Sequence, residues 1–102
     1  MAALTLTAVP FDHVTGNTEL AAAITGTRFE VVGFAISSDG TDRVKLRSGT
    51  TVITALEMIA GSVAVLPPGD HRLYGVSGSN LNILTVGAAN VSGHVLIRGQ
   101  PL

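Results

Sequence analysis

The stretch that decides the fold is Arg43-Val44-Lys45-Leu46-Arg47-Ser48-Gly49-Thr50-Thr51-Val52-Ile53-Thr54. Up to Arg47, apolar and basic residues alternate with a period of two, as in a strand with one face on the core and the other in solvent. Ser48-Gly49 has the chemistry of a tight turn, because glycine adopts positive φ at little cost. The stretch therefore predicts strand, turn and strand. Its basic side chains share the exposed face, where like charges discourage a sheet edge from pairing with stray chains.

Similar short apolar runs recur along the whole chain and predict an all-β protein. Beside this hairpin, we expect strands at residues 4–8, 19–24, 29–37, 56–59, 62–66, 72–76, 81–86 and 94–98. No segment of useful length has helical periodicity. Roughly eight short strands at a spacing of 8–12 residues are typical of an antiparallel β-sandwich or barrel. Residues 29–37 are expected to form a central strand, because they are apolar on both faces from Val31 onward.

Glycine and proline mark the ends of these strands. Pro10 is expected to limit the first strand, and residues 12–17 to form a polar loop. Residues 19–24 also have helical propensity, but the glycines on either side leave too short a segment for a stable helix. Asp39-Gly40 predicts a hairpin turn after the central strand. Pro67 ends a later strand, because proline cannot donate to a ladder of hydrogen bonds.

The composition limits the classes of function. At 102 residues, we expect a single sandwich domain, 1–102, in which residues 1–10 form an edge strand or an arm that reaches a neighbour. The chain has no cysteine, 13% charged residues and a net charge of −1, which excludes thiolate catalysis and cysteine-based zinc sites and argues against a nucleic-acid partner. A membrane partner is not expected either, because no apolar run approaches the ~20 residues of a spanning helix. Because 46% of the residues are hydrophobic, we expect part of the apolar surface to be buried against other subunits.

Sites for chemistry have little support in the sequence. His13, His71 and His94 are the histidines of the chain, and no two stand at i and i+2, the spacing that places two imidazoles on one face of a strand. Gly75-Val76-Ser77-Gly78 lacks the spacing of a nucleophile elbow, and Asp39-Gly40-Thr41-Asp42 offers too few ligands for Ca²⁺. The scattered carboxylates form a catalytic pair only if the fold brings two of them together. We therefore expect no catalytic residue, no cofactor and no metal.

The order of several short motifs resembles that of a small family of structural proteins in tailed-phage virions. The motifs are Glu19-Leu20-Ala21-Ala22-Ala23-Ile24-Thr25-Gly26, a strand ending in Ser38-Asp39-Gly40, the hairpin quoted above, Leu66-Pro67, Leu81-Asn82-Ile83 and Val91-Ser92-Gly93-His94-Val95. Two features depart from the family pattern: Arg47 stands where lysine is usual, and residues 68–74 lack an aromatic pair. The shared order over residues 18–98 carries the resemblance.

The resemblance implies a jelly-roll-like β-sandwich that acts, without enzymatic activity, as a capsid decoration or cement protein. Its location would be the capsid surface of the virion, after synthesis in the cytoplasm of the host bacterium. The implied partners are further copies of the chain, as a homotrimer, and the major capsid protein of the phage head. We expect Phe34, Ile36, Tyr74 and Leu96 to contact these partners, because we assign them to an outward face or to a departing loop.

Two other functions remain open at this point. A tail or fibre-tip module that binds a host glycan or protein would share the fold class. It would need exposed aromatic side chains along a groove, and only 4% of the residues are aromatic. A small cupin-like β-barrel enzyme would need a tightly bound metal.

Overall fold

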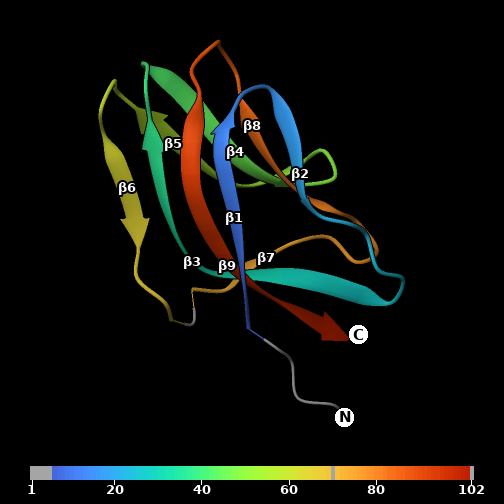
Figure 1. The fold of residues 1–102 in the computed structure, drawn as a ribbon. Helices are drawn as coiled ribbons and strands as arrows, with labels where there is room; N and C mark the ends of the chain where they lie inside the picture. Colours follow the sequence, from blue (N-terminus) through green and yellow to red (C-terminus); the bar gives the residue numbers. More distant parts are fainter. Residues whose placement is uncertain (1–5, 70, 102) are drawn as a thin grey trace.

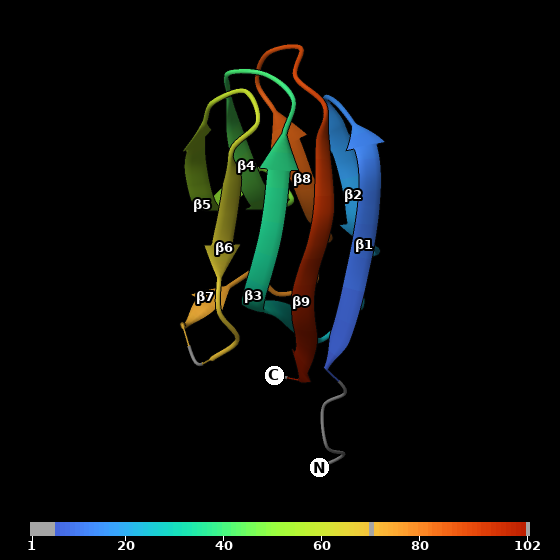
Figure 2. The same ribbon diagram turned by 60° about the vertical axis from the view of Figure 1, so that its left-hand side comes forward.

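The computed structural model describes residues 6–69 and 71–101, and within these it contains nine β-strands (Figures 1 and 2). The strands are β1 (Thr7–Val14), β2 (Asn17–Ala21), β3 (Thr27–Ser38), β4 (Asp42–Ser48), β5 (Thr51–Met58), β6 (Val63–Leu66), β7 (Leu73–Tyr74), β8 (Leu81–Thr85) and β9 (Val91–Pro101). Sheet A has the order β1-β9-β3-β6, with β7 also paired to β3, and sheet B has the order β2-β8-β4-β5. The predicted antiparallel all-β sandwich is confirmed.

The strands pair in a nested way. Strand β1 pairs with β9, β2 with β8, β3 with β6 and β4 with β5. Such nesting results when one long antiparallel ribbon is rolled into two sheets, which is the arrangement of a jelly roll. The sandwich is elongated, with extents of 43 × 24 × 19 Å, and the long strands β3 and β9 run along it from one end toward the other (Figure 2).

The core lies between the sheets, and the hairpin of β4 and β5 supplies part of it as predicted. Val44 and Leu46 are fully buried, whereas Arg43 is exposed. The turn closes at the pair Ser48 and Thr51 around Gly49, whose φ is 58°. The expected protection of a sheet edge is wrong, because β4 lies inside sheet B between β8 and β5.

The first strand is longer than expected. Pro10 does not end it, since β1 continues to Val14 with a bulge after Phe11. Proline is tolerated because β1 is the edge strand of sheet A and has a single hydrogen-bonded neighbour, β9. Residues 12–14 are therefore strand and not loop. Residues 4 and 5, which we expected to open this strand, lie outside the described residues.

The segment Asp39-Gly40 does not form the expected hairpin, because the chain crosses here from β3 in sheet A to β4 in sheet B. The backbone N–H of Asp39 donates to the carbonyl of Asn90 at 3.1 Å, and its carboxylate accepts the N–H of Asn90 at 2.7 Å. These bonds tie the crossing to the connection between β8 and β9. Other strand bounds also differ from expectation. Strand β2 covers Asn17–Ala21 instead of residues 19–24, and β5 is continuous over Thr51–Met58, so residues 56–58 do not form a separate strand. Strand β7 is limited to Leu73–Tyr74, and β9 begins at Val91.

Candidate functional site

The structure separates the predicted contact residues into two groups. Phe34 and Ile36 are 6% and 0% exposed and belong to the core, so their expected outward orientation is wrong. The cause is a bulge in β3 just before Phe34, which inserts one residue and changes which positions face inward. Leu96 is half-buried on the outer side of sheet A, and Tyr74 is 36% exposed. For Leu96 and Tyr74, contact with a partner stays a prediction.

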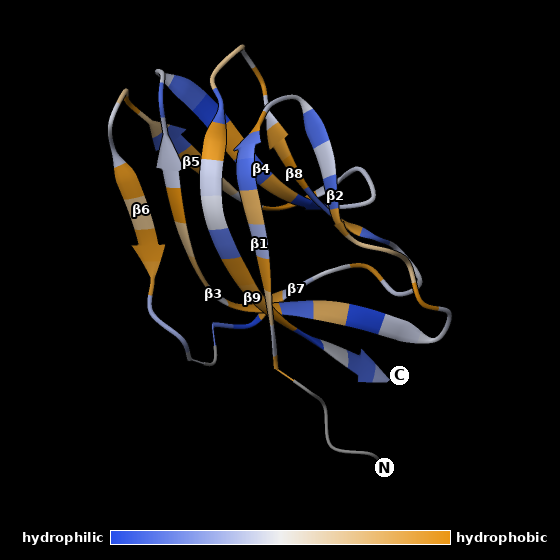
Figure 3. Ribbon diagram, viewed as in Figure 1, coloured by the Kyte–Doolittle hydropathy of each residue, from blue (hydrophilic) through white to orange (hydrophobic). Residues whose placement is uncertain are grey.

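The middle of the outer side of sheet A, which we call the sheet A face, lies between Asp12 at one end, whose Oδ1 accepts the hydroxyl of Ser92, and Glu30 and Arg98 at the other. The strand positions between them, as described by the structure, carry no Asp, Glu, Lys or Arg. Strand pairing places on this face Ala8, Pro10, Gly33, Ala35, Ser37, Val63, Val65, Ser92, His94 and Leu96. Val63 and Val65 are 62% and 63% exposed on the edge strand β6, which is coloured as hydrophobic in Figure 3. A contiguous surface of small and apolar side chains is typical of a contact with a partner.

The outer side of sheet B has the opposite character. Arg43, Lys45 and Arg47 project from it in β4, as the sequence predicts, and the first of these pairs with Glu57 of β5 through Nε and Oε1 at 2.6 Å. Nη2 of Arg47 donates to Oδ1 of Asn17 at 3.4 Å. An exposed ion pair such as that of Arg43 and Glu57 contributes little to stability, but it shows that charged side chains occupy this side of the sandwich. The two outer sides are therefore chemically distinct.

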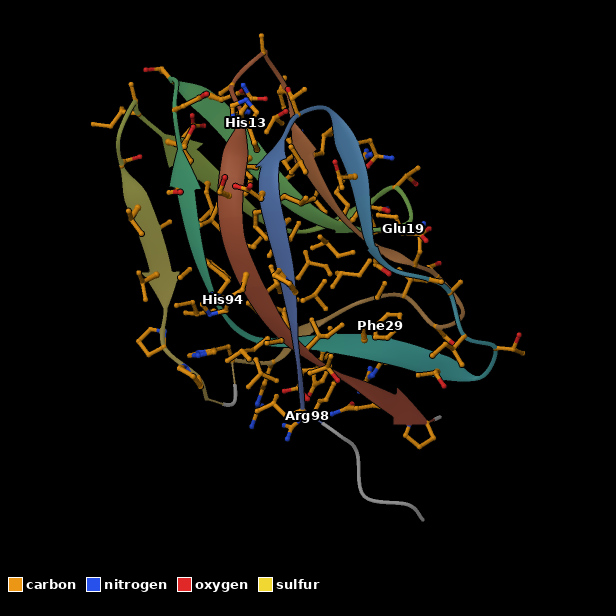
Figure 4. The ribbon with its side chains drawn as sticks, viewed as in Figure 1. His13, Glu19, Phe29, His94 and Arg98 are labelled. Atoms are coloured by element: carbon orange, nitrogen blue, oxygen red, sulfur yellow. The ribbon has the colours of Figure 1, made fainter. Side chains whose placement is uncertain are left out.

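A polar cluster, which we call the Arg28 corner, lies where β3 begins and β9 ends. The buried carboxylate of Glu30, 0% exposed, accepts Nε and Nη2 of Arg98 at 2.9 and 3.2 Å and Nε2 of Gln100 at 2.6 Å. The guanidinium of Arg28 lies over the ring of Tyr74, 4.0 Å from its centroid, and donates to Oε1 of Gln100. Arg98 is labelled at this end of the molecule in Figure 4. Sequence reasoning missed the cluster, although an isolated acid in an apolar strand was a signal.

Carboxylates gather at the other end of the molecule. Asp39 is exposed and accepts both the backbone N–H and the side-chain Nδ2 of Asn90, at 2.7 and 3.2 Å. The backbone N–H of Asn90, first, and its side chain, second, hold the pKa of Asp39 below the ordinary 3.8. Asp12 lies in the same region, where its Oδ1 accepts the hydroxyl of Ser92 at 3.1 Å. Asp39, in the connection after β3, and Asp12, in β1, are therefore both hydrogen-bonded at this end of the sandwich.

An apolar groove of about 620 Å³ opens between β1, the connection from β2 to β3, and the end of β9. Its lining includes Val9, Leu20, Ile24, Phe29 and Ile97. The described residues that line the groove include no histidine and no carboxylate. Arg98 also lines the groove, so the groove combines hydrophobic contact with a cationic side chain.

The described residues contain no group of three or more His, Asp or Glu side chains placed to hold a metal ion. His13 lies near Ser92, with its backbone N–H 2.8 Å from the Ser92 hydroxyl, whereas His71 contacts the carbonyl of Pro67 at 2.6 Å. His94 lies on the sheet A face. Figure 4 labels His13 and His94, which lie in different parts of the sandwich. Over residues 6–69 and 71–101, no helix is long and apolar enough to span a membrane.

Comparison with protein-family models finds no match, and comparison with curated proteins finds none either. Among solved structures, the chain is similar to a protein of Bacillus endospore appendages, which are described as a novel family of disulfide-linked pili. The TM-score is 0.53 at 15% sequence identity, and the match covers 98% of this chain and 88% of that chain. At this level of identity, the likeness shows a shared fold. The fold thus resembles that of a structural protein from a pilus-like appendage.

Proposed function

We propose that this protein is a non-enzymatic structural subunit, a single sandwich domain that associates with copies of itself in a larger particle. The observation that carries the proposal is the chemical difference between the sheet A face and the outer side of sheet B. The sheet A face combines exposed Val63 and Val65 with small side chains such as Ala35, whereas sheet B presents charges. Burying the sheet A face against a partner removes apolar area from water and leaves no charge of its described residues unpaired.

A matched pair of lysine substitutions tests this role. Val65→Lys places a charge on the sheet A face, and Ala55→Lys places one on the exposed outer side of the edge strand β5. We expect Val65→Lys to lower the association constant of the purified protein by about tenfold or more, because an unpaired charge is costly to bury. Ala55→Lys should leave it unchanged. Sedimentation velocity over a concentration series measures both, and equal association of the two variants would refute the role of the sheet A face.

Within this role, we propose the finer assignment to a phage particle, as a decoration protein on the head lattice. The motif order described above and the jelly-roll topology support it. Such a protein would form a homotrimer and bind the major capsid protein, with Tyr74 and Leu96 among its contact residues. A discrete species of three subunits in solution, with no larger species, is the expected result.

The likeness to the endospore appendage structure favours a second candidate, a subunit of an extracellular filament. Those appendages are described as disulfide-linked pili, whereas this chain has no cysteine. In a filament of this protein, subunits would therefore hold together through non-covalent contacts. Electron microscopy of concentrated protein separates the candidates, because open-ended filaments support an appendage and closed trimers support a decoration protein.

A further inference from the structure

The Arg28 corner holds a guanidinium in a fixed position on the surface. Nε and Nη2 of Arg28 both lie 3.4 Å from Oε1 of Gln100, and the guanidinium stacks on Tyr74. These partners are a neutral amide and a neutral ring, so they orient the charge without neutralising it. An arginine fixed on an aromatic ring is well suited to bind a carboxylate through its remaining N–H groups.

The buried Glu30 is the reason that the corner is rigid. Burial of a carboxylate is costly unless it is paired and hydrogen-bonded, and Glu30 meets this condition through Arg98 and Gln100. Because the amide of Gln100 donates to Glu30 through Nε2, its Oε1 points to Arg28. The chain of contacts thus orients Arg28, while Arg98 compensates the charge of Glu30.

The opposite end of the molecule presents the complementary group. Strand β3 begins beside Arg28 and ends at Ser38, directly before Asp39, so the two charged groups lie toward opposite ends of an elongated sandwich (Figure 2). The Asn90 contacts fix the Asp39 carboxylate and favour its ionised form. A carboxylate has about four lone-pair sites, so Asp39 keeps acceptor capacity for a further donor.

We infer that the Arg28 corner binds the Asp39 carboxylate of a second copy of this chain, so that copies line up head to tail along their long axis. The inference rests on the proposed function as a self-associating subunit and adds a second, polar contact to the one on the sheet A face. Because the two surfaces are different, the contact is heterologous, and with the copies in line along their long axes it forms an open chain. The inference therefore supports the second candidate, the filament subunit, and not the closed trimer.

A charge exchange between the two sites tests the contact. Alone, the Arg28→Asp variant brings two carboxylates together at this contact, and the Asp39→Arg variant brings two guanidinium groups together. In an equal mixture, each contact between unlike copies pairs a guanidinium with a carboxylate. We expect each variant alone to associate about tenfold more weakly than the wild type at low salt, and the mixture to recover wild-type association. High salt should weaken the wild-type contact, because it screens exposed charges.

Sedimentation equilibrium measures these constants, and circular dichroism melting checks that each variant is folded. Lys45→Glu is the matched control, because it reverses a charge on sheet B away from both sites. Wild-type association by folded Arg28→Asp and Asp39→Arg would overturn the head-to-tail contact and leave the proposed function standing. Loss in both variants without recovery in the mixture would overturn the pairing of these two groups. A wild-type protein that stays monomeric at every concentration and salt level would overturn both proposals.

Discussion

Asp42 offers a test of what holds together two connections between the sheets, the one from β3 to β4 and the one from β8 to β9. The residue is 8% exposed, and its carboxylate accepts the backbone N–H groups of Arg43 at 2.7 Å, Gly87 at 2.8 Å and Ala89 at 3.1 Å. Burial acts to raise the pKa of Asp42, but the N–H groups outweigh it and hold the pKa below the ordinary 3.8. The fold therefore stabilises the ionised carboxylate.

We expect Asp42→Asn to lower the free energy of unfolding by about 2 kcal/mol at neutral pH, since one hydrogen bond to a charged group contributes about 1.5–3 kcal/mol. In the variant, the carbonyl oxygen can still accept the N–H groups of Arg43 and Gly87. The amide nitrogen replaces Oδ2, which accepts the N–H of Ala89 in the wild type. For a domain of this size, the loss corresponds to a fall in Tm of about 8–16 °C.

The pH dependence separates this reasoning from a simple packing effect. Because the pKa of Asp42 is lower in the folded than in the unfolded chain, its stabilisation is present above the ordinary pKa of 3.8 and is lost as the pH falls through the folded pKa. The difference between wild type and Asp42→Asn should therefore shrink in acid. Urea denaturation at about pH 7 and about pH 2.5 measures it, with Glu57→Gln as an exposed control. A difference of the same size at both pH values would refute the electrostatic explanation.

Two further predictions concern sheet A. Gly93 has a φ of 145°, and a Cβ atom there would lie 2.0 Å from the carbonyl oxygen of Ala35. We therefore expect Gly93→Ala to lower the free energy of unfolding, measured by urea denaturation, by about 3 kcal/mol or more. A loss below about 1 kcal/mol would contradict the close approach of β9 to β3. Glu30→Leu should cost about 1–3 kcal/mol because it removes the buried acceptor of the Arg98 and Gln100 hydrogen bonds, whereas Glu30→Leu combined with Arg98→Leu should recover part of the loss. A double variant no more stable than the single one would show that the pair itself does not set the cost.

The parts of the fold that depend on neighbouring residues could be predicted from the sequence. The hairpin is an example, because the alternation of Val44 and Leu46 with basic residues and the turn at Gly49 are local signals. The strand at residues 29–37 is another, since its apolar character on both faces reflects a position inside a sheet. In both cases, the residues that determine the structure lie within a few positions of one another.

The errors arise where a distant segment decides the outcome. Asp39-Gly40 has the composition of a hairpin turn. However, the carboxylate of Asp39 accepts a hydrogen bond from Asn90, which lies far away in the sequence, and the chain crosses here to the other sheet. Phe34 and Ile36 face the core because a bulge against β9 changes the alternation of β3. Pro10 lies within a strand because β1 is at an edge. None of these partners can be identified from the segment itself.

The candidate sites show the same limit. The expected contact of Tyr74 with a partner stays a prediction. In the structure its ring lies under the guanidinium of Arg28, which is oriented by Gln100 and the buried Glu30. This arrangement requires β3, β7 and β9 to lie side by side, and no local pattern encodes that. A carboxylate that is fully paired within one chain contributes nothing directly to an interface. In the head-to-tail contact that we propose, its effect would be to orient the Arg28 guanidinium before a second copy arrives, which reduces the entropy lost when the contact forms.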